Sequence, residues 1–171
     1  LKGPVVGTLM TNLGLELALA EKGIPFKRAK VGDRYVLDIL HTEGGTLGGE
    51  ASGHLLILDK ATTGDAIIAA LQVLSVMKKT GKSLAELAGG MQKFPQTLLN
   101  LEVKERFDPQ TVPAIADAVK NAEGILGREG RVVLRASGTE PVIRVMVEAR
   151  EESIAKTQAD AIADAVRGAS M

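Results

Sequence analysis

Three polar side chains of complementary chemistry stand within five residues in the segment Gly49-Glu50-Ala51-Ser52-Gly53-His54. The carboxylate of Glu50 accepts hydrogen bonds, and the hydroxyl of Ser52 both donates and accepts them. Such a pair suits the hydroxyl groups of a polyol better than it suits a metal ion. The imidazole of His54 is of the side-chain type that moves protons near neutral pH. A glycine turn with a polar edge is the alternative interpretation, and composition alone favours that alternative.

A second segment, from Arg135 to Arg144, combines two guanidinium groups with two hydroxyl groups. Ser137, Gly138 and Thr139 lie between the two arginines. The planar fork of Arg makes paired hydrogen bonds to phosphate, and a glycine lets neighbouring backbone N–H groups turn toward an anion. These residues predict a phosphate-binding loop between two strands. An ordinary hairpin loop with solvated arginines is the alternative, and the residues alone favour neither.

A third charged segment, Lys30-Val31-Gly32-Asp33-Arg34-Tyr35, follows an expected strand. A strand end followed by glycine often lines a cleft in α/β folds. Gly32 and Asp33 are therefore candidates for contact with a ligand, and Lys30 and Arg34 are weaker candidates. A charged turn is the more frequent meaning of such a pattern when it stands alone.

Several other chemistries find no support in the sequence. Gly81-Lys82-Ser83 resembles the end of a Walker A loop, but Val76 stands where that motif needs Gly, so we interpret the segment as a helix cap. The chain has no Cys, which excludes a thiol nucleophile and a cysteine zinc site. No closely spaced pair of Asp residues suggests an Mg²⁺ site. His41 is interpreted as a lone histidine in a loop.

The composition is that of an ordinary globular protein of 171 residues. Lys+Arg and Asp+Glu both number 21, so bulk charge does not favour binding to nucleic acid or to an anionic membrane. Aromatic residues make up 2% of the chain, too few for stacking on bases. The longest apolar runs, Leu55–Leu58 and Ala66–Leu71, are too short to span a bilayer. We therefore expect no nucleic-acid partner and no membrane partner.

The elements that position these segments fall into two parts, divided near Pro95. In the first part we expect a strand over residues 4–9, a helix from Asn12 to Gly23, a strand over 26–31, a glycine-rich loop over 41–54, a strand over 55–59, a helix opened by Thr62 and Asp65, and a shorter helix opened by Ser83 and Glu86. The β-α-β start is typical of a partly parallel sheet. Ile67, Leu71, Leu74 and Met77 recur at helical spacing, which predicts a helix face turned toward the core.

The second part predicts the order β-α-β-β-α. The expected elements are a strand near 98–104, a helix after Asp108-Pro109, strands over 131–135 and 142–148, and a helix from about 153 to 167. Along residues 142–148, Ile143, Val145 and Val147 alternate with Arg144, Met146 and Glu148. This pattern indicates a strand with one buried face. The fold class is therefore α/β: a mixed-sheet α/β domain followed by a small α+β domain with its helices on one face of the sheet.

Taken together, these segments resemble the α-D-phosphohexomutase family. The Gly-Glu-x-Ser-Gly-His run is similar to the family's sugar-binding loop, and Arg-x-Ser-Gly-Thr-Glu-Pro-x-x-Arg is similar to its C-terminal phosphate-binding loop. Val31–Val36 and Asp59–Asp65 resemble the bacterial phosphoglucosamine mutase branch in particular. The resemblance covers the whole chain. It implies that residues 1–95 are most of the third domain, without its N-terminal part, and that residues 96–171 are the fourth domain.

The resemblance implies an isomerase that interconverts glucosamine 6-phosphate and glucosamine 1-phosphate, on the route to UDP-N-acetylglucosamine. The reaction would pass through a phosphoserine and a 1,6-bisphosphate intermediate, with Mg²⁺ as cofactor and a sugar 1,6-bisphosphate as activator. A cytoplasmic enzyme and a homodimer of the full-length protein are also implied. The family's serine loop and Asp-rich metal loop have no counterpart in this sequence, so the chain is expected to recognise substrate without transferring phosphate.

The same resemblance assigns roles to individual residues. Phosphate binding would fall to Arg135, Ser137, Gly138, Thr139 and Arg144, and sugar binding to Gly32, Asp33, Glu50, Ser52 and His54. His54 matches a position proposed to transfer a proton to or from the sugar hydroxyl. Two alternatives stay open: a phosphoglucomutase or phosphomannomutase of the same family, and a non-catalytic module that binds sugar phosphates. A purely structural domain, which binds no ligand, is a further alternative.

Overall fold

A computed structural model describes residues 1–170 of the chain. The described residues form two compact units, and the chain passes from the first to the second between Lys93 and Phe94. None of the helices formed by residues 1–170 combines the length and the apolar character that crossing a bilayer requires.

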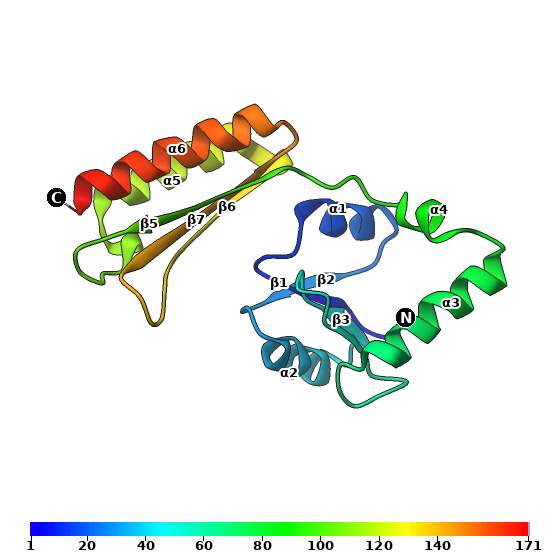
Figure 1. Ribbon diagram of the computed structural model, residues 1–171. Helices are drawn as coiled ribbons and strands as arrows, with labels where there is room; N and C mark the ends of the chain where they lie inside the picture. Colours follow the sequence, from blue (N-terminus) through cyan, green and yellow to red (C-terminus); the bar gives the residue numbers. More distant parts are fainter. Residues whose placement is uncertain (171) are drawn as a thin grey trace. The chain divides into compact units, whose positions relative to one another are not determined.

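The first unit is built on a four-stranded sheet in the order β2-β1-β3-β4 (Figure 1). Its elements are β1 (Val5–Thr8), α1 (Leu13–Glu21), β2 (Phe26–Ala29), α2 (Asp33–Glu43), β3 (Leu47–Gly49), β4 (Leu55–Ile57), α3 (Ala66–Thr80) and α4 (Leu84–Ala88). Strand β1 is parallel to both β2 and β3, and β3 is antiparallel to β4. The predicted partly parallel sheet is confirmed.

Helices α1 and α2 lie on opposite faces of this sheet (Figure 1). The α1 helix joins β1 to β2, whereas α2 carries the chain from β2 to β3 on the other side of β1. On the α2 face, Val36 and Leu40 pack with Val6 and Leu56 into a fully formed core. The direction of strand succession reverses at β1, which is the place where open α/β sheets bind ligands.

Three predictions of secondary structure and helix capping for this unit are wrong. Residues 33–43 form the helix α2, which we did not predict, so His41 lies on a helix and not in a loop. The helix α3 is capped by Asp65, whose side chain accepts from the N–H groups of Ile67 and Ile68, and Thr62 takes no part in its cap. The strand β3 lies inside the segment that we expected to be a glycine-rich loop.

The apolar stripe of α3 does not face a core. Ile67 is 74% exposed, and Leu71 and Leu74 are each 56% exposed. Only Ala69 among the residues of this helix is buried. The helical spacing was correctly recognised, but the surface that this face would need for burial is not supplied by residues 1–170.

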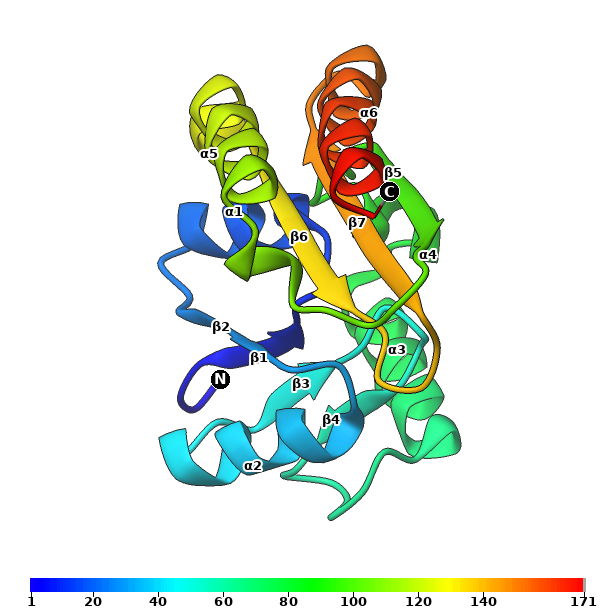
Figure 2. The same ribbon diagram turned by 90° about the vertical axis from the view of Figure 1, so that its left-hand side faces the viewer.

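The second unit is a three-stranded antiparallel sheet in the order β5-β7-β6. Its elements are β5 (Gln96–Glu102), the short 3-10 helix η1 (Pro109–Thr111), α5 (Pro113–Leu126), the 3-10 turn η2 (Gly127–Glu129), β6 (Gly130–Ala136), β7 (Val142–Ala149) and α6 (Glu152–Ala169). Helices α5 and α6 lie side by side on one face of the sheet (Figure 2). The predicted order β-α-β-β-α is confirmed.

The core of this unit lies between the sheet and the two helices. Ile143, Val145 and Val147 of β7 point into it, together with Ala159 and Ile162 of α6. The opposite face of β7 is also buried at Glu148, whose carboxylate bonds to Arg131 and to Gln96. The Asp108 side chain caps η1, whereas α5 begins four residues later than Asp108-Pro109 suggested, at Pro113.

Candidate functional site

In the first unit, the candidate residues gather where three parallel strands end. The loop after β1, the Gly32 loop after β2 and the Glu50 turn after β3 all leave the carboxyl edge of the sheet. Ligands of open α/β sheets bind in the crevice outside this edge, because the loops there are free to vary while the strands hold them in place. The topology alone therefore brings the two candidate segments, that of Gly32 and that of Glu50, to one location.

A hydrogen bond joins these two segments. The backbone N–H of Gly32 donates to Oε1 of Glu50 at 2.8 Å. Gly32 has φ 129°, a backbone conformation that favours glycine, and it is the residue that precedes the helix α2. The Glu50 side chain is only 12% exposed, so the bond fixes this carboxylate against the start of α2.

The segment from Glu50 to His54 is the tight turn of the β3–β4 hairpin. Glu50 N–H donates to the carbonyl of His54 at 2.9 Å, and Gly53 N–H donates to the carbonyl of Glu50 at 3.0 Å. Nδ1 of His54 lies 3.9 Å from Oε2 of Glu50. Ser52 is exposed at the tip, and the His54 side chain is 55% exposed. The turn thus presents one fixed carboxylate beside a hydroxyl and an imidazole that a ligand can approach.

The charged residues around Gly32 are more loosely held. Asp33 is exposed, and its Oδ1 accepts from the backbone N–H of Arg34 at 2.7 Å. Nζ of Lys30 lies 5.9 Å from the centre of the Tyr35 ring, a cation–π arrangement. These side chains stand at the same edge of the sheet as Glu50.

In the second unit, the predicted phosphate loop is the turn between β6 and β7. Arg135 and Arg144 are direct partners in the strand register. Between them, Ser137 N–H donates to the carbonyl of Val142 at 2.8 Å, and the Ser137 hydroxyl accepts from Glu140 N–H at 3.3 Å. Ser137 is buried, whereas Gly138 and Thr139 are exposed. The hydrogen bonds of the buried Ser137 thus fix the turn, and the residues at its tip are accessible to a ligand.

The guanidinium of Arg144 is incompletely satisfied. Its Nη2 lies 3.5 Å from Oε2 of Glu140, an ion pair in which both side chains are substantially exposed. Its Nε is shielded from solvent and has no hydrogen-bond acceptor among residues 1–170. Because a buried donor without an acceptor is costly, this nitrogen favours an anion that reaches it. A phosphate oxygen is such an acceptor.

Two contributions at these sites were missed by sequence reasoning. Glu140 both supports Ser137 through its N–H and pairs with Arg144, although its i,i+4 spacing to Arg144 gave a usable signal. Arg28 donates to the carbonyls of Thr8 and Thr11 and to the carboxylate of Glu16, and so fastens the loop after β1. No local sequence pattern predicts this role of Arg28, because its hydrogen-bond partners are 12 to 20 residues away in the sequence.

The described residues offer no ready place for a metal ion. Within residues 1–170, no group of three or more His, Asp or Glu side chains is arranged to hold one. The residues present therefore do not fit the Mg²⁺ that the family resemblance implies, and no step through a metal is assigned to this chain.

Two family models match the chain in sequence order. Residues 1–94 match the phosphoglucomutase/phosphomannomutase alpha/beta/alpha domain III, and residues 98–165 match the C-terminal domain of the same family. The chain belongs to the phosphoglucomutase/phosphomannomutase family. The resemblance that the two loops indicated is thereby confirmed, together with the fold class.

A relative of high sequence identity supports membership of this family, and solved structures share the fold. The phosphoglucosamine mutase of Pseudoalteromonas atlantica is 55% identical over 169 residues, which are 99% of this chain and 38% of that protein. The chain thus spans about two fifths of the length of this relative. Two crystal structures of Aspergillus fumigatus N-acetylphosphoglucosamine mutase share its fold, one in complex with GlcNAc-6P and magnesium and one with glucose 1,6-bisphosphate. Their TM-scores are 0.80 and 0.79, with 22% and 23% identity, over 98% of this chain and 39% of theirs.

Proposed function

We propose that this chain is the part of a phosphoglucosamine mutase that recognises the sugar and the non-reacting phosphate of its substrate. The full protein would interconvert glucosamine 6-phosphate and glucosamine 1-phosphate. Family membership and 55% identity to a relative of that name support the proposal. In the same proposal, residues 1–95 carry the sugar-binding loop and residues 96–171 the phosphate-binding loop.

The chemical step would take place on parts of the protein outside this chain. A phosphoserine would donate its phosphoryl group to the free hydroxyl of the sugar phosphate, which loses its proton. The resulting 1,6-bisphosphate would reorient, and its other phosphoryl group would pass to the serine. Mg²⁺ would supply charge neutralisation on the reacting phosphate in such a scheme. The proposed contribution of this chain is positioning, which accounts for much of the rate in phosphoryl transfer.

The observation that carries the proposal is the β6–β7 turn. Arg135 and Arg144 stand opposite each other, and Arg144 keeps a shielded donor without an acceptor in the described structure. A phosphate bound here would accept from both guanidiniums, from the hydroxyls of Ser137 and Thr139, and from backbone N–H groups near Gly138. The phosphate would carry close to two negative charges, which matches the two cations.

The sugar would be held by the edge residues of the first unit. Glu50 is fixed by Gly32, so it can accept hydrogen bonds from sugar hydroxyls without losing side-chain freedom on binding. Ser52 and Asp33 would add contacts from the exposed rim. His54, near Glu50 and open to solvent, would exchange a proton with the sugar hydroxyl.

Titration of the isotopically labelled chain with glucosamine 6-phosphate, followed by NMR, tests the proposal. Inorganic phosphate is the control ligand, and glucose and mannose 6-phosphates probe sugar preference. We expect both ligand types to shift Ser137–Thr139, and only sugar phosphates to shift Glu50–His54. Absence of shifts at Ser137–Thr139 with every ligand would contradict the proposed phosphate site. Equal shifts with all three sugars would favour a phosphohexomutase of broader preference.

A further inference from the structure

The sheet of the second unit has one face that no helix covers, on the side away from α5 and α6 (Figure 2). Side chains alternate between the two faces of a strand. Because Ile143, Val145 and Val147 point into the core under the helices, the residues between them belong to the other face. We call this surface the helix-free face. The strand register arranges its side chains in rows that run from β5 across β7 to β6.

One row on the helix-free face is fully satisfied. Glu148 lies at its centre, opposite Gln96 on β5 and opposite Arg131 on β6. The carboxylate of Glu148 is fully buried, and it accepts from Nε2 of Gln96 at 2.7 Å and from Nε of Arg131. This row, the Glu148 row, therefore combines an amide donor, an anion and a guanidinium, and each of the three groups has a partner.

A second row has the same types of side chain at its two ends but no anion. Arg144 lies at its centre, opposite Asn100 on β5 and opposite Arg135 on β6. The shielded Nε of Arg144 has no acceptor among residues 1–170. The Asn100 side chain is exposed, and it makes no hydrogen bond within the same residues. This row, the Arg144 row, thus holds an amide and two guanidiniums without the negative charge that completes the Glu148 row.

The carboxylates nearest to the Arg144 row do not replace the missing anion. Glu148 stands four residues from Arg144 on the same strand. That separation is about 13 Å, more than the screening length at physiological salt. Glu140 approaches Arg144 only to 3.5 Å, at an exposed position. Glu102 lies opposite Val142 in the register, and it forms no ion pair among residues 1–170. The cations of the row are therefore left for an anion from outside.

We propose that Asn100 is a further phosphate-binding residue, whose side-chain amide donates a hydrogen bond to the phosphate held by Arg135 and Arg144. The inference rests on the proposed phosphate site at the β6–β7 turn. An Asn amide carries two N–H donors. Opposite side chains on neighbouring strands start about 4.5 to 5.5 Å apart, so an anion over Arg144 is within reach of Asn100. The phosphate then occupies the place in the Arg144 row that the carboxylate occupies in the Glu148 row.

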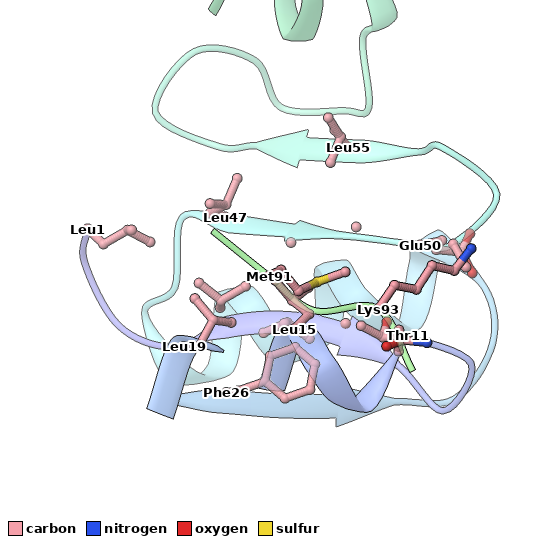
Figure 3. A pocket seen from close by; sticks show the side chains of 17 residues that line it. Leu1, Thr11, Leu15, Leu19, Phe26, Leu47, Glu50, Leu55, Met91 and Lys93 are labelled. Carbon is pink, nitrogen blue, oxygen red and sulfur yellow. The ribbon is translucent and has the colours of Figure 1, made fainter. Parts of the chain in front are cut away.

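The apolar cavity of the first unit is a poorer place for an anion (Figure 3). Its volume is about 510 Å³, and its lining is mainly aliphatic and aromatic. The cation in that lining, Lys93, lies at the same end as the carboxylate of Glu50 (Figure 3). A phosphate there would meet apolar surface and a like charge, whereas the Arg144 row offers two cations and a neutral donor.

Two substitutions of Asn100 and one matched control test the inference. Asn100→Ala removes the donor, and Asn100→Asp puts a carboxylate in its place. Asn121→Asp makes the same change of charge at an exposed position of α5, on the other side of the sheet. Each variant of the 171-residue chain is titrated with inorganic phosphate and with glucosamine 6-phosphate. NMR follows the side-chain amide resonances of Asn100 and Asn121, and urea unfolding measures stability.

We expect phosphate to shift the side-chain amide resonances of Asn100 and not those of Asn121. The dissociation constant for phosphate should rise by about tenfold in Asn100→Ala, because one hydrogen bond to a charged group is lost. It should rise by at least about thirtyfold in Asn100→Asp, because the introduced carboxylate repels phosphate. The urea midpoint of the second unit should rise in the same variant, since the row gains its anion. Asn121→Asp should leave the affinity within about twofold of the wild type.

Three results would overturn the inference. If both Asn100 variants kept the wild-type affinity while Arg144→Ala lost it, Asn100 would not bind phosphate, but the proposed phosphate site would stand. If Arg144→Ala also kept the affinity, the proposed site would fail as well. If Asn100→Ala weakened binding but phosphate did not shift the Asn100 side-chain amide in the wild type, Asn100 would not touch phosphate. Asn100→Asp is expected to gain stability, so it remains a test if Asn100→Ala folds poorly.

Discussion

Arg135 on β6 and Arg144 on β7 lie directly opposite each other in an antiparallel register. Like charges in this position destabilise a strand pair, and only Glu140 forms a described ion pair with either of them among residues 1–170. That ion pair is exposed and 3.5 Å long, so it compensates little. The hairpin therefore carries an excess of positive charge near its turn, which the anion that we propose to bind there would reduce.

Replacing Arg144 is expected to separate binding from stability. The substitution Arg144→Ala removes the charged donor that we propose for phosphate, so we expect the dissociation constant for glucosamine 6-phosphate to rise by about tenfold or more. It also removes half of a repulsive pair, so the free energy of unfolding should change by less than about 0.5 kcal/mol. Calorimetric titration and urea unfolding measure the two effects.

Two further variants serve as controls for this experiment. Arg128→Ala removes an exposed arginine of the same unit outside the turn and should leave phosphate affinity within about twofold. Arg144→Lys keeps the charge but loses the planar fork, so its affinity should fall between that of the wild type and that of Arg144→Ala. If Arg128→Ala weakened binding as much as Arg144→Ala, net charge rather than the turn would account for the affinity.

The bond between Gly32 and Glu50 predicts different results for two substitutions of the same residue. In Glu50→Gln, the side-chain carbonyl can still accept from Gly32 N–H, so the turn should keep its place while the loss of charge weakens sugar binding. In Glu50→Ala, this acceptor is gone, and we expect a loss of about 1 to 3 kcal/mol in stability. Amide hydrogen exchange of Gly32 reports the bond, and NMR titration reports the affinity.

The exchange rate at Gly32 decides whether the bond exists in solution. It should stay slow in Glu50→Gln and become fast in Glu50→Ala. Fast exchange in the wild-type chain would show that the two segments are not joined. An unchanged affinity in Glu50→Gln, with slow exchange retained, would leave Glu50 as a structural residue only.

The sequence was most informative where short-range rules decide the structure. In the second unit, the alternation along β7 and the helical spacing of Ala155, Ala159 and Ile162 both report faces that pack against each other within the unit. The asparagine cap of α1 and the capping box of α4 are likewise local, and both were found. The two chemical loops were recognisable because each is continuous in sequence.

The failures came where the missing information was not local. The α3 stripe of Ile67, Leu71 and Leu74 has helical spacing, but spacing does not say whether a partner surface exists within residues 1–170. The helix α2 was missed because Gly32, the residue before it, has no side chain to cap the helix, and because its first residues are charged. The Gly32–Glu50 bond spans 18 residues, and only the topology of the sheet brings these ends together.

Two glycines of the same turn are expected to differ in their tolerance of alanine. A Cβ on Gly49 would lie 2.6 Å from the carbonyl oxygen of His54, which is backbone and cannot move aside without opening the turn. Gly53 has φ 97° but has nothing within 4 Å of its Cβ position. We expect Gly49→Ala to cost about 2 to 3 kcal/mol of unfolding free energy and Gly53→Ala about 1 kcal/mol. Urea unfolding followed through resonances of the first unit measures both, and equal costs would contradict the close approach at Gly49.

The capping box of α4 predicts a local dependence on pH. Oε2 of Glu86 accepts from the hydroxyl and from the backbone N–H of Ser83, both at 2.7 Å, and Ser83 accepts from Glu86 N–H in return. The side-chain hydrogen bond from Ser83, followed by the backbone one, lowers the pKa of Glu86 below its ordinary value. Both bonds favour the ionised carboxylate, so Glu86 binds a proton more weakly in the folded helix than in the unfolded chain.

The sign of the effect follows from this difference in pKa. The cap contributes its full stabilisation above the ordinary pKa of a Glu carboxyl, and the contribution is lost as the pH falls through the lowered pKa of the folded state. We expect α4 to fray in this acid range before the second unit changes, because Glu86 is exposed and the helix has five residues. The amide shifts of Leu87 and Ala88, followed through an acid titration, measure this fraying. Ser83→Ala removes the hydroxyl but keeps the backbone N–H, so the pKa of Glu86 should rise toward its ordinary value, and the pH dependence of these shifts should move with it. An unchanged titration of Glu86 in that variant would show that the capping box does not persist in solution.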